Sequence, residues 1–285
     1  MNNVKESSNI LKKCDAILVI AGAGMSADSG IFTYRGDDGI WTKNITIGNK
    51  NYGYDEISSL EMWKTNPELA WGFKAGFYDL MASKKPHKGY YKLLDFLKGT
   101  KKNNYFICTS NIDNFFEKSG YDKDKIYEVH GSMNYLQCMD KKCAIRNGII
   151  EMTKKYLPTF TRENFVASHL PSCPNCKNIL RPNVSMFGDY DFYGKPYEYA
   201  RKKMEKWLQN IEKNNQTLVI LEIGCGINPH SVRMKDGVMM SGEWKIPKIK
   251  NLIKTIRVNP NDEQEDSNTI HVNLGALQGI NRLID

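Results

Sequence analysis

Four of the seven cysteines occur as two closely spaced pairs, which is the pattern of a structural zinc site. Cys138 and Cys143 are separated by four residues, and Cys173 and Cys176 by two. Each pair can supply two thiolates to one tetrahedral Zn²⁺ ion. Four thiolates leave no open position for water, so we expect the metal to hold the surrounding chain together without taking part in catalysis. Four unrelated buried thiols are the alternative.

A glycine-rich turn lies directly after the first apolar run of the chain, residues 15–21. It consists of Gly22, Ala23, Gly24, Met25, Ser26 and Ala27, which fit the pattern G-x-G-x-x-A. Glycine lets the backbone approach a pyrophosphate, and the N–H groups of a following helix would face its negative charge. No residue fits the acidic position that dehydrogenases carry about 20 residues further on. The turn indicates a nucleotide site, with a plain tight turn as the alternative, and does not favour a dehydrogenase.

Three other apolar runs also end in small or polar residues. Residues 105–109 lead into Ser110, Asn111, Ile112 and Asp113; residues 217–223 lead into Gly224, Cys225 and Gly226; and residues 254–258 lead into Asn259 and Pro260. Open α/β sheets bind ligands outside the carboxyl ends of their strands. The pattern predicts one site lined by residues 22–35, 109–113, 224–226 and 259–260. A short run, residues 127–130, ends at His130, which taken alone is typical of a satisfied buried histidine.

Helical periodicity separates these runs. Residues 60–81 have apolar side chains at helical spacing with a break at Asn66-Pro67, and residues 90–97 and 196–213 are also expected to be helical. Alternating strands and helices predict an α/β fold with a Rossmann-like, doubly wound parallel sheet. Residues 36–51 are rich in Gly, Asn and Asp and predict a loop. Residues 133–180 hold the cysteine pairs and have weak periodicity, so they predict a small inserted zinc-binding module.

The composition is that of a globular chain. Its 285 residues, 41% of them hydrophobic, suffice for one large domain with a small insertion, and the net charge of +8 is spread along the chain. The longest apolar runs, 16–23 and 218–223, are shorter than the roughly 20 residues that span a bilayer. Residues 1–14 contain no apolar stretch of signal-peptide length. We therefore expect a cytoplasmic protein that requires neither nucleic acid nor a membrane.

The remaining cysteines and histidines have no comparable context. Cys14, Cys108 and Cys225 lie in or beside apolar runs and are expected to be small core residues. The histidines at positions 87, 169, 230 and 271 are expected at the surface.

The order and spacing of these motifs resemble the sirtuin family over residues 14–284. The stretches that carry the resemblance are residues 22–36, Thr109–Asp113, Glu128–Ser132, the two cysteine pairs and Arg181–Gly188. They look like the first cofactor motif, the Thr-Gln-Asn-Ile-Asp motif, the catalytic His-Gly segment, the zinc ligands and the peptide-cleft segment of that family.

The resemblance implies a Rossmann-like NAD-binding domain and a zinc module. The first would comprise residues 1–132 and 181–285, with a cofactor loop and helical part at 36–100, and the second residues 133–180. NAD would lie between them, and the acyl group of an acyl-lysine protein or peptide would pass to ADP-ribose as the nicotinamide–ribose bond is cleaved. His130 would be the general base on a ribose hydroxyl, Asn111 would hold the ribose and position water, and Asp113 would contact the nicotinamide amide.

The resemblance also implies the binding residues. NAD would contact Gly22, Ala23, Gly24, Ser26, Ala27, Tyr34, Arg35, Trp41, Ser110, Asn111, Ile112, Asp113, His130, Gly224, Cys225, Gly226, Asn259 and Pro260. The peptide substrate would contact Val184, Ser185, Met186, Phe187 and Gly188.

Several positions depart from the deacylase pattern. Ser110 replaces a glutamine, Phe116 replaces a histidine, and Gly226 replaces a serine at the phosphate site, where backbone N–H groups or Arg233 could compensate. The Tyr-x-x-Arg pair that recognises acidic acyl groups in the family is replaced by Lys74–Phe77. This replacement does not favour succinyl or malonyl substrates.

The retained triple of His130, Asn111 and Asp113 predicts an NAD-dependent protein-lysine deacylase. A protein ADP-ribosyltransferase is the alternative, because residues 221–229 also look like divergent microbial sirtuins. A non-catalytic NAD-binding module is the second alternative. Hydrolysis of free NAD is not favoured, because a pure NAD hydrolase needs no peptide cleft.

Overall fold

Six short apolar segments form one parallel sheet in the order β13-β12-β9-β1-β4-β5. They are β1 (Ala16–Ala21), β4 (Tyr105–Thr109), β5 (Ile126–Glu128), β9 (Leu218–Ile223), β12 (Leu252–Val258) and β13 (Thr269–Val272). The computed structural model describes residues 2–33, 45–101, 103–161, 163–226, 232–235, 238–239, 251–260 and 267–285. The predicted Rossmann-like fold class is confirmed.

The strand register brings the ends of five strands to one level. Ala21 lies opposite Thr109 on one side and Ile223 on the other. Ile223 pairs in turn with Val258, and Thr109 with Glu128. The segments that follow these residues therefore leave the sheet at the same edge, which is where parallel sheets bind ligands.

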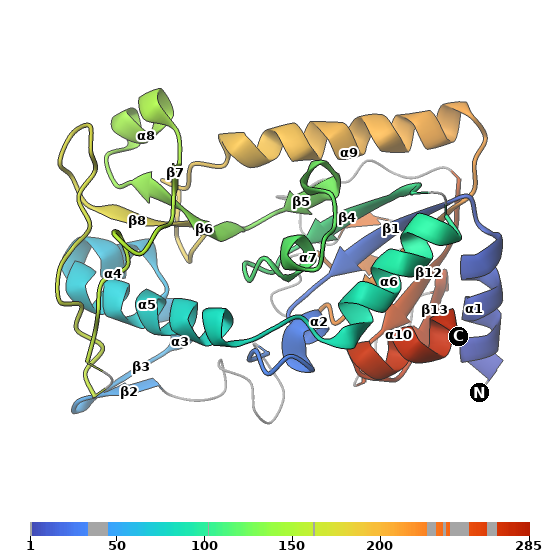
Figure 1. The fold of residues 1–285 in the computed structure, drawn as a ribbon, viewed down its shortest axis with the longest axis horizontal. Helices are drawn as coiled ribbons and strands as arrows, with labels where there is room; N and C mark the ends of the chain where they lie inside the picture. The colour runs from blue at the N-terminus through green and yellow to red at the C-terminus, as the bar shows by residue number, and fades with distance from the viewer. Residues whose placement is uncertain are drawn as a thin grey trace.

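Both faces of the sheet are buried, which explains why its central strands are continuous apolar runs. In β1, Ile17, Val19 and Ala21 pack into one core, whereas Leu18 and Ile20 pack into another on the opposite face. The first core includes residues of α1 (Asn2–Lys13), α6 (Lys88–Gly99) and α10 (Ala276–Ile284), and the second includes residues of α9 (Lys195–Lys213). Figure 1 shows α6 and α10 on one side of the sheet and α9 on the other.

A three-stranded antiparallel sheet lies at the opposite end of the molecule from α1 (Figure 1). Its order is β7 (Ile150–Glu151), β6 (Gly131–Cys138) and β8 (Leu180–Val184), and α8 (Lys141–Asn147) follows β6. Only Val129 and His130 separate β5 of the large sheet from β6 of the small one. The chain therefore passes from one sheet to the other through His130.

A helical part lies beside the small sheet (Figure 1). It contains α3 (Tyr54–Ile57), α4 (Leu60–Thr65) and α5 (Pro67–Ser83), and the Asn66 side chain caps α5 by accepting from the Leu69 amide. The other short elements are α2 (Gly24–Ala27), β2 (Ile45–Ile47), β3 (Lys50–Tyr52), α7 (Phe115–Lys118), the 3₁₀ turn η1 (Lys123–Lys125), β10 (Met234–Lys235) and β11 (Val238–Met239).

Some local predictions were wrong. Residues 45–52 form a hairpin of β2 and β3 where a loop was expected, because Gly48, at φ +57°, permits a tight turn there. The helix expected at 90–97 is longer and runs from Lys88 to Gly99. The sequence patterns did not indicate α1, β13 or α10. Among the described residues, no helix is both long and apolar enough to cross a membrane.

Candidate functional site

The glycine turn after β1 packs directly against the turn after β9. The Gly24 amide donates to the Gly224 carbonyl oxygen at 3.0 Å, and Gly224 has a φ of +63°. A Cβ atom on Gly24 would lie 2.6 Å from the Gly224 Cα, and one on Gly224 would lie 2.4 Å from the Gly24 Cα. These glycines are therefore required by the contact between the two turns, in addition to any ligand that they bind.

Two side-chain contacts fix the orientation of the backbone in the second turn. The Cys225 carbonyl oxygen accepts from Arg233 Nη1 at 2.9 Å and from Asn259 Nδ2 at 3.1 Å. The Cys225 side chain is buried, so only its backbone can face a ligand. Gly226 is exposed, and a Cβ atom there would meet no atom of the described residues within 4 Å.

Arg233 was considered as a phosphate ligand, but its guanidinium belongs to a buried ion cluster. Its Nη1 atom lies 3.7 Å from Glu222 Oε1, and Arg257 Nε donates to the same oxygen at 2.6 Å. Glu222 Oε2 accepts from the Met234 amide at 2.9 Å. The cluster ties residues 232–235 to β9 and β12 below the second turn. The sequence contained no signal for it, since a single glutamate within an apolar strand predicts no partner.

A buried polar network connects the first turn to the segment after β4. Ser26 Oγ donates to Asp113 Oδ2 at 2.5 Å, accepts from Asn111 Nδ2 at 3.2 Å and lies 2.8 Å from the Tyr90 hydroxyl. Asp113 Oδ1 accepts from the Phe115 amide at 2.9 Å. Burial raises the pKa of Asp113 above its ordinary value, although these hydrogen bonds oppose the shift. The network holds Asn111 and Asp113 at the edge of the sheet.

His130 lies at the junction of the two sheets. Its carbonyl oxygen accepts from the Ser185 amide at 2.9 Å, and Gly131, at φ +77°, follows it into β6. Burial lowers the pKa of His130 from 6.5 to about 4. The imidazole is therefore neutral at pH 7, which is the form that can accept a proton.

The segment after β8 lies between His130 and the helical part. The Phe187 amide donates to the Ser58 carbonyl oxygen, and the Phe187 carbonyl oxygen accepts from the Leu60 amide, both at 3.1 Å. Residues Val184–Gly188, expected to bind the peptide, are thus held between the catalytic histidine candidate and the start of α4.

A small hollow of about 20 Å³ lies between the first turn and α5. It is lined by Ala23, Ser26, Ile31, Phe32, Phe77, Met81, Asn111, Ile112 and Asp113. Among the described residues, Asp113 is the one ionisable group in this lining. The sequence did not single out Ile31, Phe32, Phe77 or Met81, because their spacing is that of ordinary core residues.

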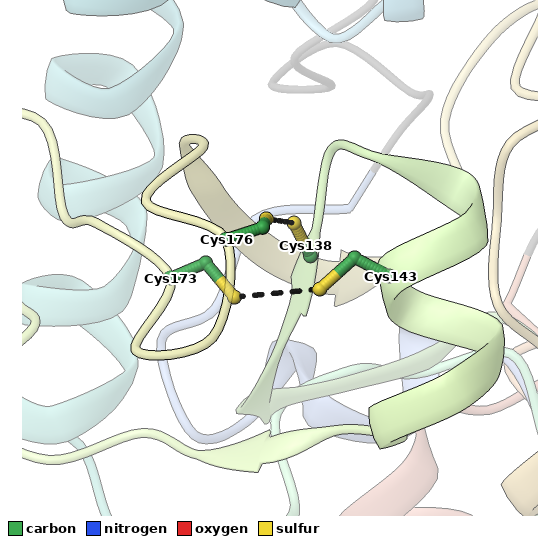
Figure 2. Close-up of side chains that lie close together, drawn as sticks. All are labelled: Cys138, Cys143, Cys173 and Cys176. Carbon is green, nitrogen blue, oxygen red and sulfur yellow. Dashed lines mark hydrogen bonds between the residues drawn. The ribbon is translucent and has the colours of Figure 1, made fainter.

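The four paired cysteines converge on one point (Figure 2). The Sγ atoms of Cys138 and Cys176 lie 3.4 Å apart, those of Cys143 and Cys173 lie 3.7 Å apart, and all four lie within 4.8 Å of one another. A tetrahedral ion with Zn–S bonds of about 2.3 Å places its sulfur ligands about 3.8 Å apart. The predicted Cys₄ zinc site is confirmed by this geometry. Its position in the small sheet, away from Asn111 and Asp113, assigns the metal to structure.

The placement of the other predicted residues is mixed. Tyr34, Arg35 and Trp41 lie outside the described residues, as does His230. Ala27, Ser110, Asn259 and Pro260 lie at the predicted edge of the sheet with the glycine turns. Cys14, Cys108 and Cys225 are buried, as expected for core residues.

The expectation that His87 lies at the surface was wrong. His87 is only 8% exposed, its Nε2 atom lies 2.8 Å from the Met25 carbonyl oxygen, and its Nδ1 atom accepts from the Gly89 amide at 3.0 Å. It caps α6 and connects that helix to the segment after β1, a role that sequence context could not indicate.

Comparison with known proteins identifies the class. The Sir2 family model matches residues 22–226, and this chain belongs to the Sir2, or sirtuin, family.

Three curated relatives are named NAD-dependent protein deacylases. That of Leptospira interrogans is 26% identical over 265 residues, which cover 87% of this chain and 96% of the relative. That of Candida albicans is 27% identical over 220 residues, covering 65% and 69%. That of Pyrococcus furiosus is 32% identical over 186 residues, covering 65% of each protein.

Solved structures of Sir2 proteins share the fold. A Sir2 homolog–NAD complex has a TM-score of 0.67 at 19% identity, covering 98% of this chain and 92% of that one. A Sir2 protein with a deacetylated p53 peptide and 3′-O-acetyl ADP-ribose has a TM-score of 0.63 at 18% identity, covering 99% and 97%.

Proposed function

We propose that this chain is an NAD-dependent protein-lysine deacylase. The observation that carries the proposal is the meeting of three features at one edge of the sheet: the paired glycine turns, the Asn111–Asp113 segment and His130. The peptide-cleft segment is bonded to His130 through Ser185. The three relatives named as deacylases support the same activity.

The NAD molecule supplies an ADP-ribose acceptor for the acyl group when its nicotinamide–ribose bond is cleaved. The turns at Gly24 and Gly224 would hold the phosphates of NAD. The Cys225 carbonyl oxygen points toward Arg233 and Asn259. Because the next peptide bond is trans, the Gly226 N–H points in the opposite direction and can donate to a phosphate. Asn111, held by Ser26, would orient the ribose. The neutral imidazole of His130 would take the proton from a ribose hydroxyl.

The residues that line the small hollow favour a neutral acyl group on the substrate lysine. Phe77 lines the hollow beside Asp113, whereas Lys74, one helical turn before it, is buried and donates to Ser58 Oγ at 2.7 Å. Among the residues that the structure describes, the lining of the hollow therefore presents no cation to a succinyl or malonyl carboxylate. We expect acetyl-lysine to be preferred.

The test is a product assay with NAD and matched acetyl-lysine and succinyl-lysine peptides. We expect equal amounts of nicotinamide and O-acetyl-ADP-ribose by mass spectrometry. We also expect His130→Ala to lower kcat by about 10²-fold or more, the typical contribution of a general base. ADP-ribose attached covalently to a carrier protein would support ADP-ribosyl transfer in place of deacylation. Tight NAD binding without turnover of any acyl peptide would support a binding module.

A further inference from the structure

A second, larger cavity of about 200 Å³ lies on the other side of the Asn111–Asp113 segment, at the edge strand β5. It is bordered by α7, η1, the ends of β5 and β6, and the first turns of α9, and opens to solvent. Its lining includes Phe116, Ile126, Glu128, Tyr135, Tyr197 and Ala200. Figure 1 shows α7 and α9 approaching β5 from opposite sides. A dry cavity of about 150 Å³ accommodates benzene, so this volume suits a ligand with one ring.

The cavity overlaps the candidate NAD site at Asn111 and Asp113 and extends away from the glycine turns. None of the glycines of the two turns lines it, and neither do Ser26 and His130. Asn111 and Asp113 line both this cavity and the small hollow beside the first turn. The segment that holds them is therefore a shared wall between the two spaces.

Two of the four carboxyl groups in the cavity lining, Asp113 and Glu128, form no ion pair among the described residues, and Asp113 is already hydrogen-bonded to Ser26 and the Phe115 amide. The two lysines of the lining are already engaged: Lys123 pairs with Glu117, and Lys203 Nζ lies 2.8 Å from Asp124 Oδ1. Among the described residues, Glu128 forms no ion pair. Glu128 is half-buried and is hydrogen-bonded to the Ser132 side chain. A carboxylate that is partly removed from water without a cation beside it is costly, so an incoming cation would relieve this cost.

The other walls suit the body of an organic cation. Phe116, Tyr135, Tyr197 and Tyr199 contribute aromatic rings to the lining. The Tyr197 hydroxyl is fixed by donating to Asn183 Oδ1 at 2.8 Å. Aromatic faces attract ammonium groups within about 6 Å, and sites that combine such faces with a carboxylate recognise amines.

We propose that this cavity binds a small organic amine, with its ammonium group on Glu128 and its apolar body between α7 and α9. The bound amine would contact the rear of the Asn111–Asp113 segment. Its binding would therefore be coupled to that of NAD on the other side, and this coupling, unlike the binding itself, rests on the proposed function.

The charge on Glu128 makes the binding pH-dependent. Burial raises the pKa of Glu128 to about 8. The titratable and charged groups that face it are Glu117 of α7, Lys123 of η1, Asp113, Tyr135 of β6 and Tyr197 of α9. An ammonium ligand requires the ionised carboxylate, whereas at pH 6 the carboxyl group is mostly protonated. Affinity should therefore rise by about tenfold or more between pH 6 and pH 8 as this proton is released.

Phenethylamine is the probe for the test, and 2-phenylethanol is its neutral isostere. We expect saturable binding of the amine to the intact protein at pH 8 by calorimetry, and at least tenfold weaker binding of the alcohol. Glu128→Gln should weaken amine binding at least tenfold and abolish its pH dependence. Ala200→Leu, which fills the cavity, should weaken both probes, whereas Glu61→Gln, an exposed acid on α4, should change neither.

Each outcome bears on the proposal. Equal amine affinity in the wild type, Glu128→Gln and Ala200→Leu would overturn it, as would the absence of saturable binding to the wild type. Circular dichroism of each variant shows whether the fold is retained, and the two variants alter different walls, so that one remains informative if the other is unfolded. An amine Kd that NAD leaves unchanged would overturn the coupling, and a shifted Kd would support it even if no acyl peptide is turned over.

Discussion

At the scale of single residues, burial sets the protonation of the two central titratable groups. Burial lowers the pKa of His130 to about 4 and raises that of Asp113. Both shifts favour the neutral form, as expected where desolvation dominates over nearby charges. The site therefore holds an uncharged base, His130, and a carboxyl group, Asp113, whose hydrogen bonds from Ser26 and Phe115 partly restore its acidity.

The pH profile tests this assignment. The imidazole acts in its neutral form, so activity should persist above the His130 pKa and fall only as the pH drops through about 4. We expect kcat/KM for NAD to show no loss attributable to histidine between pH 7 and pH 5. A loss centred near 6.5 in the wild type would contradict the lowered pKa.

The free energy of unfolding should also depend on the protonation of His130. The unfolded chain binds a proton on His130 near pH 6.5, but the folded chain does so only near pH 4. The contribution of His130 to the free energy of unfolding is therefore fully present above pH 6.5 and is lost as the pH falls from 6.5 to about 4.

At the scale of elements, the contact between the two turns depends on glycine at specific positions. Gly224 combines a φ of +63° with a backbone contact that a Cβ atom would violate, whereas a Cβ atom on Gly226, two residues later, would meet no described residue within 4 Å. Strained backbone conformations cost about 1–3 kcal/mol each before any steric clash is included.

Gly224→Ala and Gly226→Ala form a matched pair. We expect Gly224→Ala to lower the free energy of unfolding by about 2–4 kcal/mol and Gly226→Ala to change it by less than about 0.5 kcal/mol. Urea denaturation of both variants measures the difference. Equal losses would show that the contact between the turns is not the reason for glycine at position 224.

At the scale of the whole molecule, the cysteine cluster and the catalytic histidine candidate are connected by one strand, β6. His130 precedes β6, and β6 carries Cys138 at its other end. β8 pairs with β6 and leads into Ser185, whose amide donates to the His130 carbonyl oxygen. A metal that takes no part in the chemistry can therefore still control the position of His130.

Removal of the metal tests this connection. We expect about one Zn²⁺ per chain by elemental analysis, and loss of both zinc and turnover in Cys143→Ser. Cys108→Ala is the control, because Cys108 is buried in β4 away from the cluster, and this variant should retain its zinc. Full turnover by a zinc-free Cys143→Ser protein would contradict the connection.

Local patterns in the sequence predicted much of the fold. The central strands are apolar on both faces, so their positions and their parallel pairing followed from composition and from the alternation with helices. The edge strand β13 was missed because only two of its four residues are buried, which leaves a weak signal. The α10 helix was missed because its nine residues lie next to that unrecognised strand.

The sequence by itself determined the sheet, the cysteine set and the residues that follow each strand, because these depend on residue types and short spacings. Only the tertiary structure decided what those residues contact. The opposed glycine turns, the Ser26 network, the buried His87 and the Glu222–Arg257 cluster all join residues far apart in the chain. The second cavity arises in the same way, since α7 and α9 meet at β5 only after the sheet has formed. Such contacts leave no periodicity in the sequence, because each partner by itself looks like an ordinary core or turn residue.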